Sequence, residues 1–364
     1  MASDTLLTNR PIALPTELSG ITPAWLDAAL GSANPGVRVE NARVVDVNHG
    51  TCTKVRIALE VNAAGKAAGI PESVILKGGF EPHSRAMHYM HGEEVHAYAD
   101  VRPNSPLRMP ECWFARYHEE RQQGIVIMDD LVSRGVEFLH PQRPQAPELV
   151  AKRLTRLAQH HALTWDSPDI RPGGRYDWAG RVGDATYFST VLVPEIWQGY
   201  VNSARGAAAS VCFHDLDWML GAVETFARLE RSLPNALVHG DTHLGNLYID
   251  VDGEPGFFDS IPHVTAPMFE IAYHITCALD VPVRRAHERA LVGHYREELI
   301  RCGVDAPPLD ELMRQFGCFL AHGYAIFLVN ASEFQPEAIN TAYTARFSSA
   351  MLDHDTIGLL NAVP

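Results

Sequence analysis

The stretch from Leu237 to Asp259 reads LVHGDTHLGNLYIDVDGEPGFFD, and it carries the strongest structural information in this chain of 364 residues. Its second half has two apolar runs on either side of Asp252-Gly253, a pair that is a strong signal for a tight β-turn. If Asp252 and Gly253 are the two loop residues, Asn246 and Asp259 lie opposite one another at the open end of a hairpin, about 5 Å apart at Cα. The stretch therefore predicts that an amide oxygen and a carboxylate come together.

Asn246 and Asp259 are candidate metal ligands. Amide and carboxylate oxygens are hard ligands, and Mg²⁺ in phosphoryl-transfer sites is held by one or two such groups together with phosphate oxygens and waters. Pro255 cannot donate to a strand ladder, so the register of the hairpin is open to an irregularity. We expect the two ends of the hairpin to converge in either case.

The segment HGDTHLGN has the spacing of a catalytic loop. Asp241 stands five residues before Asn246, as the catalytic aspartate stands before the metal-binding asparagine in protein kinases. The segment resembles the motif HGDxHxxN or HGDxWxxN of the aminoglycoside phosphotransferase, choline kinase and ecdysteroid-kinase-like group of small-molecule kinases. By that resemblance, Asp241 would orient a substrate hydroxyl and accept its proton, and His239 would brace the loop. Asn246 and Asp259 would bind Mg²⁺.

Two residues of the N-terminal half fit the ATP-phosphate site of the same group. Lys77 ends the apolar run VILKG, where the group has its phosphate-binding lysine. Glu94 in EVHAY fits the helix glutamate that pairs with this lysine, although Glu93 stands beside it as a competitor. The resemblance therefore implies a Lys77 to Glu94 ion pair.

Two further segments complete the implied ATP site. GIVIMDDL is similar to the hinge of the group, whose backbone from Asp129 to Leu131 would bind adenine. The polar connection NHGTCT would be the phosphate loop, with Gly50 as its single glycine. The chain departs from the group at Ser260 and Ile261, which replace a large aromatic residue and Gln, and at Glu270, where EIA replaces DLA.

The order of the elements predicts an α+β fold. Strand-like runs at 42–47, 54–61 and 73–78 precede a helix at about 83–101 and two more strands at 112–118 and 124–130. Helical periodicity follows, beginning with ELVAKRLTRLAQHHALTW at 148–165, where Leu149, Leu154, Leu157, His161 and Leu163 share one face. We expect a two-lobed protein-kinase-like fold, with a β-rich ATP-binding lobe at 1–130 that has one crossing helix. A larger helical lobe at 131–364 would hold the catalytic residues and the substrate.

Composition and charge exclude other classes. The net charge of −14 would repel a phosphate backbone, so we expect no nucleic-acid partner. The six cysteines have no CxxC spacing, which indicates reduced thiols. The first twenty residues lack the pattern of a signal peptide, and the apolar stretch Phe316 to Val329 is too short to span a bilayer. A cytoplasmic protein without a membrane partner is expected.

Two other functions remain open on the sequence. His239, Asp241 and His243 alternate, so on a strand all three would face one way, as in a metal-dependent phosphoesterase. That class needs further His and Asp motifs, and neither an early DxH nor a late GHxH is present. The other function is a catalytically inactive kinase-like binding protein, although Lys77, Asp241, Asn246 and Asp259 are all in place.

The sequence constrains the identity of the acceptor molecule least. The acidic excess would suit a cationic amino sugar, whereas aromatic residues would suit an amino alcohol held by cation–π contact or a flat, sterol-like alcohol. The aromatic candidates are Trp178, Tyr187, Trp197, Tyr200 and Trp218. The sequence thus predicts an ATP- and Mg²⁺-dependent kinase for a small-molecule hydroxyl and leaves the choice of molecule open.

Overall fold

The computed structural model describes residues 12–181 and 186–363. The chain divides into two compact units, an N-terminal unit of residues 1–137 and 249–261 and a C-terminal unit of residues 138–248 and 262–364. The expected boundary at residue 130 precedes the end of the first segment, and the expected division did not include the return of residues 249–261. This return places Asp259 in the same unit as Lys77.

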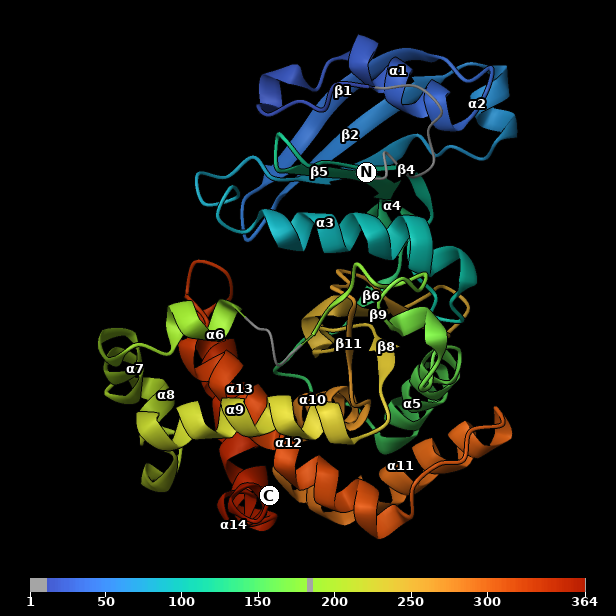
Figure 1. Cartoon of the computed structure of the whole chain (residues 1–364). Coiled ribbons are helices and arrows are strands. Elements are labelled where there is room, and N and C mark those ends of the chain that lie inside the picture. Colours follow the sequence, from blue (N-terminus) through green and yellow to red (C-terminus); the bar gives the residue numbers. More distant parts are fainter. Residues whose placement is uncertain (1–11, 182–185, 364) are drawn as a thin grey trace. The chain divides into compact units, whose positions relative to one another are not determined.

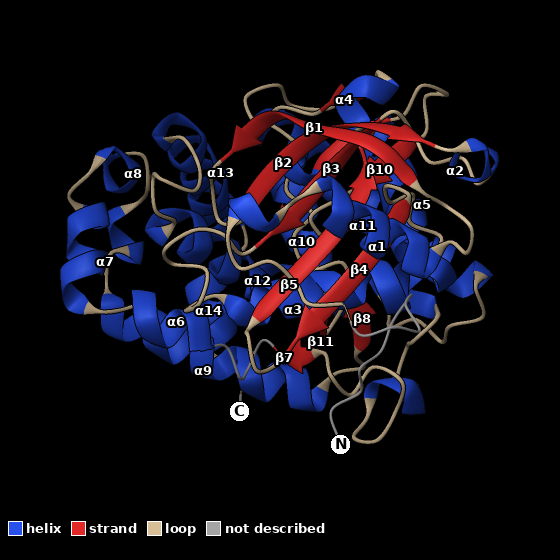
Figure 2. Ribbon diagram, turned by 90° about the horizontal axis from the view of Figure 1, so that it is seen from above, coloured by secondary structure: helices blue, strands red, loops and turns tan. Residues whose placement is uncertain are grey.

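A five-stranded antiparallel sheet forms the centre of the N-terminal unit, with strand order β1-β2-β3-β5-β4 (Figures 1 and 2). The five strands occur where the sequence predicts them, and the predicted bounds of β3 and β4 are confirmed. The strands are β1 (Val39–Asn48), β2 (Thr53–Val61), β3 (Ser73–Gly78), β4 (Cys112–His118) and β5 (Gln123–Asp129). In the ladder between β2 and β3, Lys54 is the register partner of Lys77.

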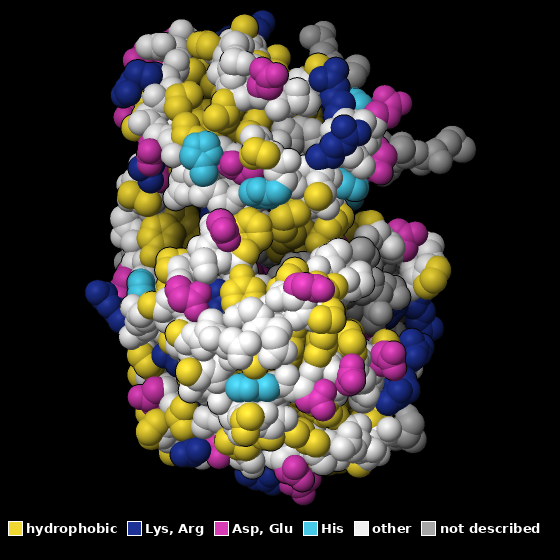
Figure 3. All heavy atoms as spheres, turned by 90° about the vertical axis from the view of Figure 1, so that its left-hand side faces the viewer, with side chains coloured by type: hydrophobic (Ala, Val, Ile, Leu, Met, Phe, Trp, Pro, Cys, Tyr) yellow, Lys and Arg dark blue, Asp and Glu magenta, His cyan; other side chains and the backbone are white. Residues whose placement is uncertain are grey.

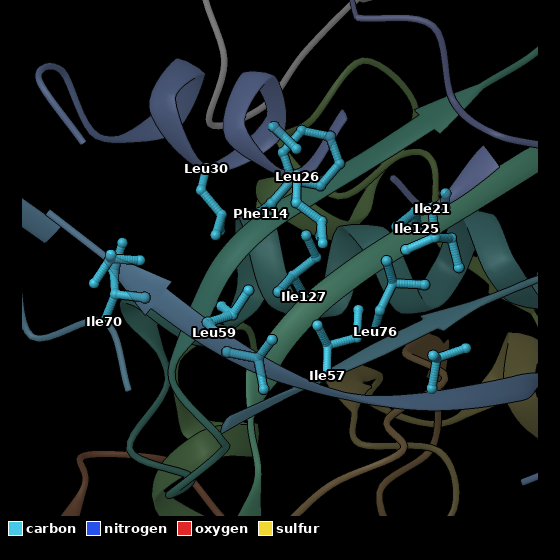
Figure 4. Packing of buried hydrophobic residues seen from close by; sticks show 14 of the residues in the cluster. Ile21, Leu26, Leu30, Ile57, Leu59, Ile70, Leu76, Phe114, Ile125 and Ile127 are labelled. Carbon is cyan, nitrogen blue, oxygen red and sulfur yellow. The ribbon is translucent and has the colours of Figure 1, made fainter. Parts of the chain in front are cut away.

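Alternation along the strands builds the core of this unit. Val55, Ile57 and Leu59 on β2 are buried, while the residues between them are less so, as expected for a strand with one face against a core. These side chains pack with Leu26 and Leu30 of helix α1 (Pro23–Ala33), which covers one face of the sheet (Figure 4). Figure 1 shows helix α3 (His88–His96) on the opposite face, where it packs against β5.

The ends of the helices in this unit follow from residues close to them in the sequence. Thr22 caps α1, because its hydroxyl accepts a hydrogen bond from the Trp25 amide at 3.1 Å. The expected helix at 83–101 begins later, at His88, because the residues before it form turns. It continues as a π-helical segment, Ala97–Val101. The shorter helices are α2 (Ala63–Ala67), α4 (Leu131–Arg134) and the 3-10 turns Leu18–Gly20 and Arg102–Asn104.

The Asp-Gly turn forms, but with a different register from the predicted one. The Asp250 amide donates to the Glu254 carbonyl at 2.9 Å, and the Gly253 amide donates to the Asp250 carbonyl at 2.8 Å. Gly253 has a φ of +82°, so the loop is a type I turn followed by a left-handed glycine, with three loop residues in place of two. The predicted register is therefore wrong by one residue, and a ladder continued from this turn would set Phe258, not Asp259, opposite Asn246. The strands around the turn are β9 (Leu247–Ile249) and β10 (Pro255–Phe257).

Two arginines of the N-terminal unit hold this turn. The Asp250 carboxylate is fully buried and forms ion pairs with Arg108, at 2.9 Å, and with Arg134. Arg108 also pairs with Asp252 at 2.7 Å, and its carbonyl accepts the Phe257 amide at 2.9 Å. The segment that carries Asp259 is thus fixed within the N-terminal unit on both sides of the turn.

The C-terminal unit is helical and is built around α10 (Met268–Ala278), every residue of which is buried. Helices α5 (Pro147–Ala162), α11 (Val281–Arg301), α12 (Leu309–Val329) and α13 (Glu337–Asp353) pack around α10 (Figure 1). The other helices are α6 (Thr186–Val191), α7 (Pro194–Val201), α8 (Ala204–Ala207), α9 (Leu216–Ser232) and α14 (Thr356–Asn361). A small sheet has the order β7-β11-β8, with strands Gly180–Arg181, His263–Thr265 and Ala236–Val238. Strand β6 (Glu137–Phe138) lies where the chain passes from one unit to the other.

Two helices of this unit test the sequence patterns. On α5, Leu154, Leu157 and His161 are buried as predicted, whereas Leu163 is exposed because the helix ends at Ala162. Helix α12 begins at Leu309, well before the predicted apolar stretch, so it is long and apolar enough to cross a membrane, alone among the described helices. Its most apolar window is 78% buried inside the structure, so it packs as a core helix of this unit.

On the face shown in Figure 3, acidic, basic and histidine side chains are interspersed with apolar ones. All six cysteines belong to the described residues, and each is a free thiol. Cys52, Cys277 and Cys318 are buried.

Candidate active-site residues

Lys77 and Glu94 form a buried ion pair in the N-terminal unit. Lys77 lies near the end of β3, and its Nζ atom is 2.6 Å from Oε1 of Glu94 on α3. The structure thus selects Glu94 over Glu93 as the partner. Burial raises the pKa of Glu93 to about 7. The ion pair that the sequence predicts is present, and its two residues lie 17 positions apart in the chain.

Asp259 joins this pair. Its Oδ1 atom is 2.9 Å from Nζ of Lys77, and its Oδ2 atom is 3.3 Å from Nζ of Lys54 on β2. Burial alone would raise the pKa of Asp259, but the two ammonium groups hold it below its usual range. Burial alone would lower the pKa of Lys77, but Asp259 and Glu94 raise it well above its usual value. Burial raises the pKa of Glu94, while the Lys77 ammonium group lowers it. Two ammonium groups therefore lie against two carboxyl groups, of which Asp259 stays ionised.

The connection between β1 and β2 is fixed by side chains. Thr53 donates its hydroxyl to Oε1 of Glu81 at 2.6 Å, and His49 places Nδ1 2.8 Å from the same oxygen. His83 contacts the Thr51 carbonyl at 3.1 Å. Gly50 has no positive φ, and a Cβ atom there would meet only ordinary contacts. Side-chain hydrogen bonds, and not glycine backbone freedom, hold the expected phosphate loop.

The expected hinge is a strand end followed by one helical turn. Asp129 closes β5 and accepts a hydrogen bond from Trp113 Nε1 at 3.0 Å, while Leu131 begins α4. Between them, Asp130 caps α4 by accepting the Val132 amide at 3.1 Å. The backbone of Asp129 to Leu131 thus lies at the end of β5, a strand that is paired on both sides, and its contact with adenine stays a prediction.

The catalytic-loop residues meet in the C-terminal unit. Asn246 donates from Nδ2 to Oδ2 of Asp241 at 2.8 Å and to the Asp241 carbonyl at 3.1 Å. Tyr273 of α10 donates its hydroxyl to Oδ1 of Asp241 at 3.0 Å. Both carboxylate oxygens therefore accept a hydrogen bond, which fixes the orientation of Asp241. Because Nδ2 of Asn246 is the donor in these bonds, the Oδ1 atom of Asn246 is the atom that can coordinate a cation.

Three residues of α10 brace this loop. Glu270, Tyr273 and His274 have the i, i+3, i+4 spacing that places side chains on one helix face. Glu270 accepts the His239 amide at 3.2 Å and the Gly240 amide at 2.7 Å. His274 contacts the Thr242 carbonyl through Nδ1 at 2.9 Å, and burial lowers its pKa to about 3, so the neutral ring donates here. Although Glu270 replaces the aspartate of the DLA pattern, a carboxylate at this position still accepts hydrogen bonds from the backbone of the loop.

Sequence reasoning missed Lys54, Tyr273 and His274. For the two α10 residues a signal was available, because their spacing from Glu270 predicts a common face on any helix that begins near residue 268. The sequence places His161 on one face of its helix with the leucines, but it does not predict that Nε2 of His161 lies 2.9 Å from Oε2 of Glu270.

Glu270 predicts a pH-dependent contribution to stability. Burial alone would raise its pKa, but the hydrogen bond and charge of His161 and the Gly240 amide lower it to about 2 from an ordinary value of 4.5. We expect Glu270→Gln to reduce the free energy of unfolding by about 3 kcal/mol at pH 7. Because the folded-state pKa is depressed, the difference is complete above about pH 4.5 and is lost as the pH falls toward 2. Urea unfolding at pH 7 and below 4.5 measures it, with the exposed Glu297→Gln as control; a difference independent of pH contradicts the assignment.

His239, Asp241 and His243 do not form the metal cluster of the rival reading. They lie in a loop and not on a strand, since β8 ends at Val238 and Gly240 has a φ of +94°. The His239 ring accepts the Asp241 amide at 3.3 Å, and the His243 ring accepts the Gly245 amide at 3.0 Å. Across residues 12–181 and 186–363, no group of three or more His, Cys, Asp or Glu side chains could hold a metal ion. The His239 ring is thus hydrogen-bonded within the loop, and its role in the reaction stays a prediction.

The aromatic candidates for acceptor binding have different environments. Trp197 is buried and donates from Nε1 to the His214 carbonyl at 2.7 Å, so it is a core residue. Tyr200 is partly exposed and lies beneath the Arg205 guanidinium, 4.2 Å from ring centroid to Cζ. Trp178 and Trp218 are partly exposed, and the side chain of Tyr187 lies outside the described residues.

Tyr273 gives a test of how the carboxylate of Asp241 is held. Tyr273→Phe removes one hydroxyl, while the ring keeps its stacking on Phe327, at 5.5 Å between centroids. We expect kcat to fall about tenfold, because one of the two hydrogen bonds that orient Asp241 is lost, and nucleotide affinity to stay unchanged. Steady-state kinetics and calorimetry measure the two quantities. Unchanged kcat would mean that Asn246 alone suffices to orient the carboxylate.

No protein-family model matches the sequence, and no curated protein matches it either. Solved structures do match the fold. A protein from Ralstonia eutropha JMP134, assigned provisionally to the aminoglycoside phosphotransferases, matches with a TM-score of 0.53 at 13% identity, over 92% of this chain and 97% of that chain. The aminoglycoside phosphotransferase APH(2″)-IIIa, solved with GDP and kanamycin, matches with a TM-score of 0.50 at 8% identity, over 90% of this chain and 98% of that chain.

These likenesses cover almost the whole length of each chain, so they concern the complete fold and not one unit. The chain has the α+β, protein-kinase-like fold of small-molecule phosphotransferases, as the sequence predicts. At these identities the likeness shows the fold alone, and the chemistry has to be argued from the residues.

Proposed function

We propose that this protein is an ATP- and Mg²⁺-dependent phosphotransferase that moves the γ-phosphate to a hydroxyl of a small molecule. The observation that carries the proposal is the group of Lys77, Glu94 and Asp259 in one unit together with Asp241, held by Asn246, in the other. These are the parts that phosphoryl transfer requires, namely a cation for phosphates, metal ligands and an oriented base.

Each residue has one task in this proposal. Lys77, held by Glu94, would bind the α- and β-phosphates as a compact point charge. Asp241 would align the acceptor hydroxyl and take its proton as the oxygen attacks the γ-phosphate. Because Tyr273 and Asn246 already fix the Asp241 carboxylate, little reorganisation is needed when the acceptor arrives.

The residues present suit Mg²⁺. Asp259 supplies a carboxylate that stays ionised, and Asn246 supplies an amide oxygen, both of which are hard ligands. Bound there, Mg²⁺ would offset the negative charge of the phosphates. The adenine contacts at Asp129 to Leu131 and the placement of Gly50 beside the phosphates are part of the same proposal.

The acceptor belongs to one of three classes: an amino sugar, an amino alcohol or a sterol-like alcohol. The net charge of −14 supports a cationic acceptor in general terms. The described aromatic residues support no single class, since Trp197 serves the core and Tyr200 contacts Arg205. A soluble, cytoplasmic enzyme without a nucleic-acid or membrane partner is part of the proposal.

A nucleotide-consumption screen tests the function. Mg-ATP is offered with a library of alcohols, amino sugars, choline-like amines and sterols, and the same library is repeated with Mg-GTP because the nucleotide base is not fixed by these residues. We expect acceptor-dependent nucleotide consumption that Asp241→Asn removes. Consumption that the variant retains would assign the activity to a contaminant or to other residues.

The two rival functions give different results on the same preparation. Hydrolysis of a chromogenic phosphoester without nucleotide would favour the phosphoesterase function. Against that function, no group of three or more His, Cys, Asp or Glu side chains among the described residues could hold a metal ion. Nucleotide binding without turnover on any acceptor would favour the inactive binding protein. Against this last reading, Lys77, Asp241, Asn246 and Asp259 are all present and ordered by hydrogen bonds or ion pairs.

A further inference from the structure

Lys54 shares a carboxylate with Lys77. The two lysines face one another as register partners on β2 and β3, and each contacts a different oxygen of Asp259. A carboxylate has about four lone-pair directions, and the two ammonium groups take two of them. A metal ion at Asp259 would compete with these ammonium groups and repel them, because all three are cations.

The identity of this residue is informative because the chain uses little lysine. Lys and Arg together number 30, and only four of these are lysines: Lys54, Lys66, Lys77 and Lys152. Two of the four meet at Asp259, although arginine is the usual cation everywhere else in this sequence. A lysine ammonium is a compact point charge that can move between anionic partners, whereas a guanidinium prefers a fixed, planar pairing.

The two lysines differ in how firmly they are held. The Lys77 side chain is 7% exposed and is tied to Glu94 as well as to Asp259. The Lys54 side chain is 41% exposed, and Asp259 is its one ion-pair partner among the described residues. Asp259 raises the pKa of Lys54, so the group is charged. If a metal ion takes Asp259, Lys54 becomes a charged group that needs a new anion, and it can reach one because it is half solvated.

We propose that Lys54 is a second phosphate-binding lysine, which neutralises Asp259 in the nucleotide-free protein and moves to the nucleotide polyphosphate when Mg²⁺ binds Asp259. This inference rests on the proposed function. It adds an exchange of partners: Asp259 exchanges an ammonium group for Mg²⁺, and Lys54 exchanges a carboxylate for a phosphate. Lys54 and Asp259 thus each keep a partner of opposite charge before and after nucleotide binding.

Calorimetry with two ligands tests the role of Lys54. We expect Lys54→Met to weaken Mg-ADP binding about tenfold, because a charge-assisted contact to phosphate is lost. The same variant should bind adenosine with unchanged affinity, since adenosine has no phosphate. Lys54→Arg should recover part of the Mg-ADP affinity. Lys66→Met, at an exposed lysine of α2 in the same unit, should leave both affinities unchanged.

Each outcome decides the inference. If Lys54→Met lowers the thermal midpoint but binds Mg-ADP as the wild type does, Lys54 is a structural brace for Asp259 and the inference is overturned. If adenosine binding falls as much as Mg-ADP binding, the effect is not on phosphate and the inference is overturned too. Lys77→Met separates the inference about Lys54 from the proposed function. Loss of Mg-ADP binding in Lys77→Met supports the proposed function, whether or not Lys54→Met changes binding. A wild-type protein that does not bind Mg-ADP overturns both.

Discussion

Asp241→Asn should lower kcat by roughly 10² to 10⁴-fold and leave the affinity for Mg-ATP nearly unchanged. The amide keeps the shape of the side chain, and its oxygen can still accept a hydrogen bond from Tyr273 or Asn246. It cannot accept the proton of the acceptor hydroxyl. The loss therefore falls on the chemical step and not on binding, because nucleotide contacts are assigned to residues of the other unit.

The test of this prediction compares turnover with binding on one preparation. Steady-state kinetics with the best acceptor from the screen give kcat, and calorimetry gives the affinity for Mg-ADP. Asp305→Asn makes the same chemical change at an exposed position of the same unit and should alter neither quantity. Near wild-type turnover of Asp241→Asn would remove Asp241 from the role of base.

The sheet and the catalytic loop could be predicted because their signals are local. Strands such as β2 alternate buried residues with less buried ones at a period of two, and this pattern is visible without knowledge of the partner strand. The spacing of Asp241 and Asn246 is also local, so their contact follows from the loop itself. The Lys77 to Glu94 pair is not local, and it was found through resemblance to the kinase group.

The register of the hairpin could not be read from its turn signal. An Asp-Gly pair fits a two-residue loop, but it also fits a type I turn that ends in a left-handed glycine, and the two differ by one residue. The longer loop forms here, where Arg108 and Arg134 converge on the buried Asp250 carboxylate. Those arginines are distant from the turn in sequence, so the residues next to the turn do not show which of the two loops will form.

The roles of Lys54 and Tyr273 had the same difficulty. Lys54 reads as an ordinary outward residue of β2 until its register with Lys77 is known. Tyr273 reads as one more buried aromatic of α10, and its hydroxyl becomes informative only once Asp241 is placed beside it. In both cases the side-chain type was visible, and the partner depended on the tertiary fold.

Asp259→Asn should abolish the part of nucleotide binding that depends on Mg²⁺. Asparagine is the suitable replacement, because Asp259 has a φ of +54° and asparagine tolerates this left-handed conformation better than alanine does. The substitution removes the ionised carboxylate that contacts both Lys54 and Lys77. Lys77 then keeps Glu94, while Lys54 loses its one ion-pair partner among the described residues, so the site gains positive charge and loses its ionised metal ligand.

The loss of the metal ligand lowers the affinity for ADP with Mg²⁺, whereas the gain of positive charge does not lower the affinity for ADP without Mg²⁺. This difference makes the test specific. Calorimetry with ADP in the presence of Mg²⁺ and in the presence of a chelator gives the contribution of the metal as a difference. For Asp259→Asn we expect this difference to vanish, and we expect metal-free ADP to bind as well as it binds the wild type or better, since the lysines are freed for phosphate. Asp252→Asn changes a half-exposed aspartate of the same hairpin and should preserve the wild-type difference. If Mg²⁺ still strengthens ADP binding to Asp259→Asn as it does for the wild type, the metal is held elsewhere, and the exchange of partners inferred for Lys54 loses its cause.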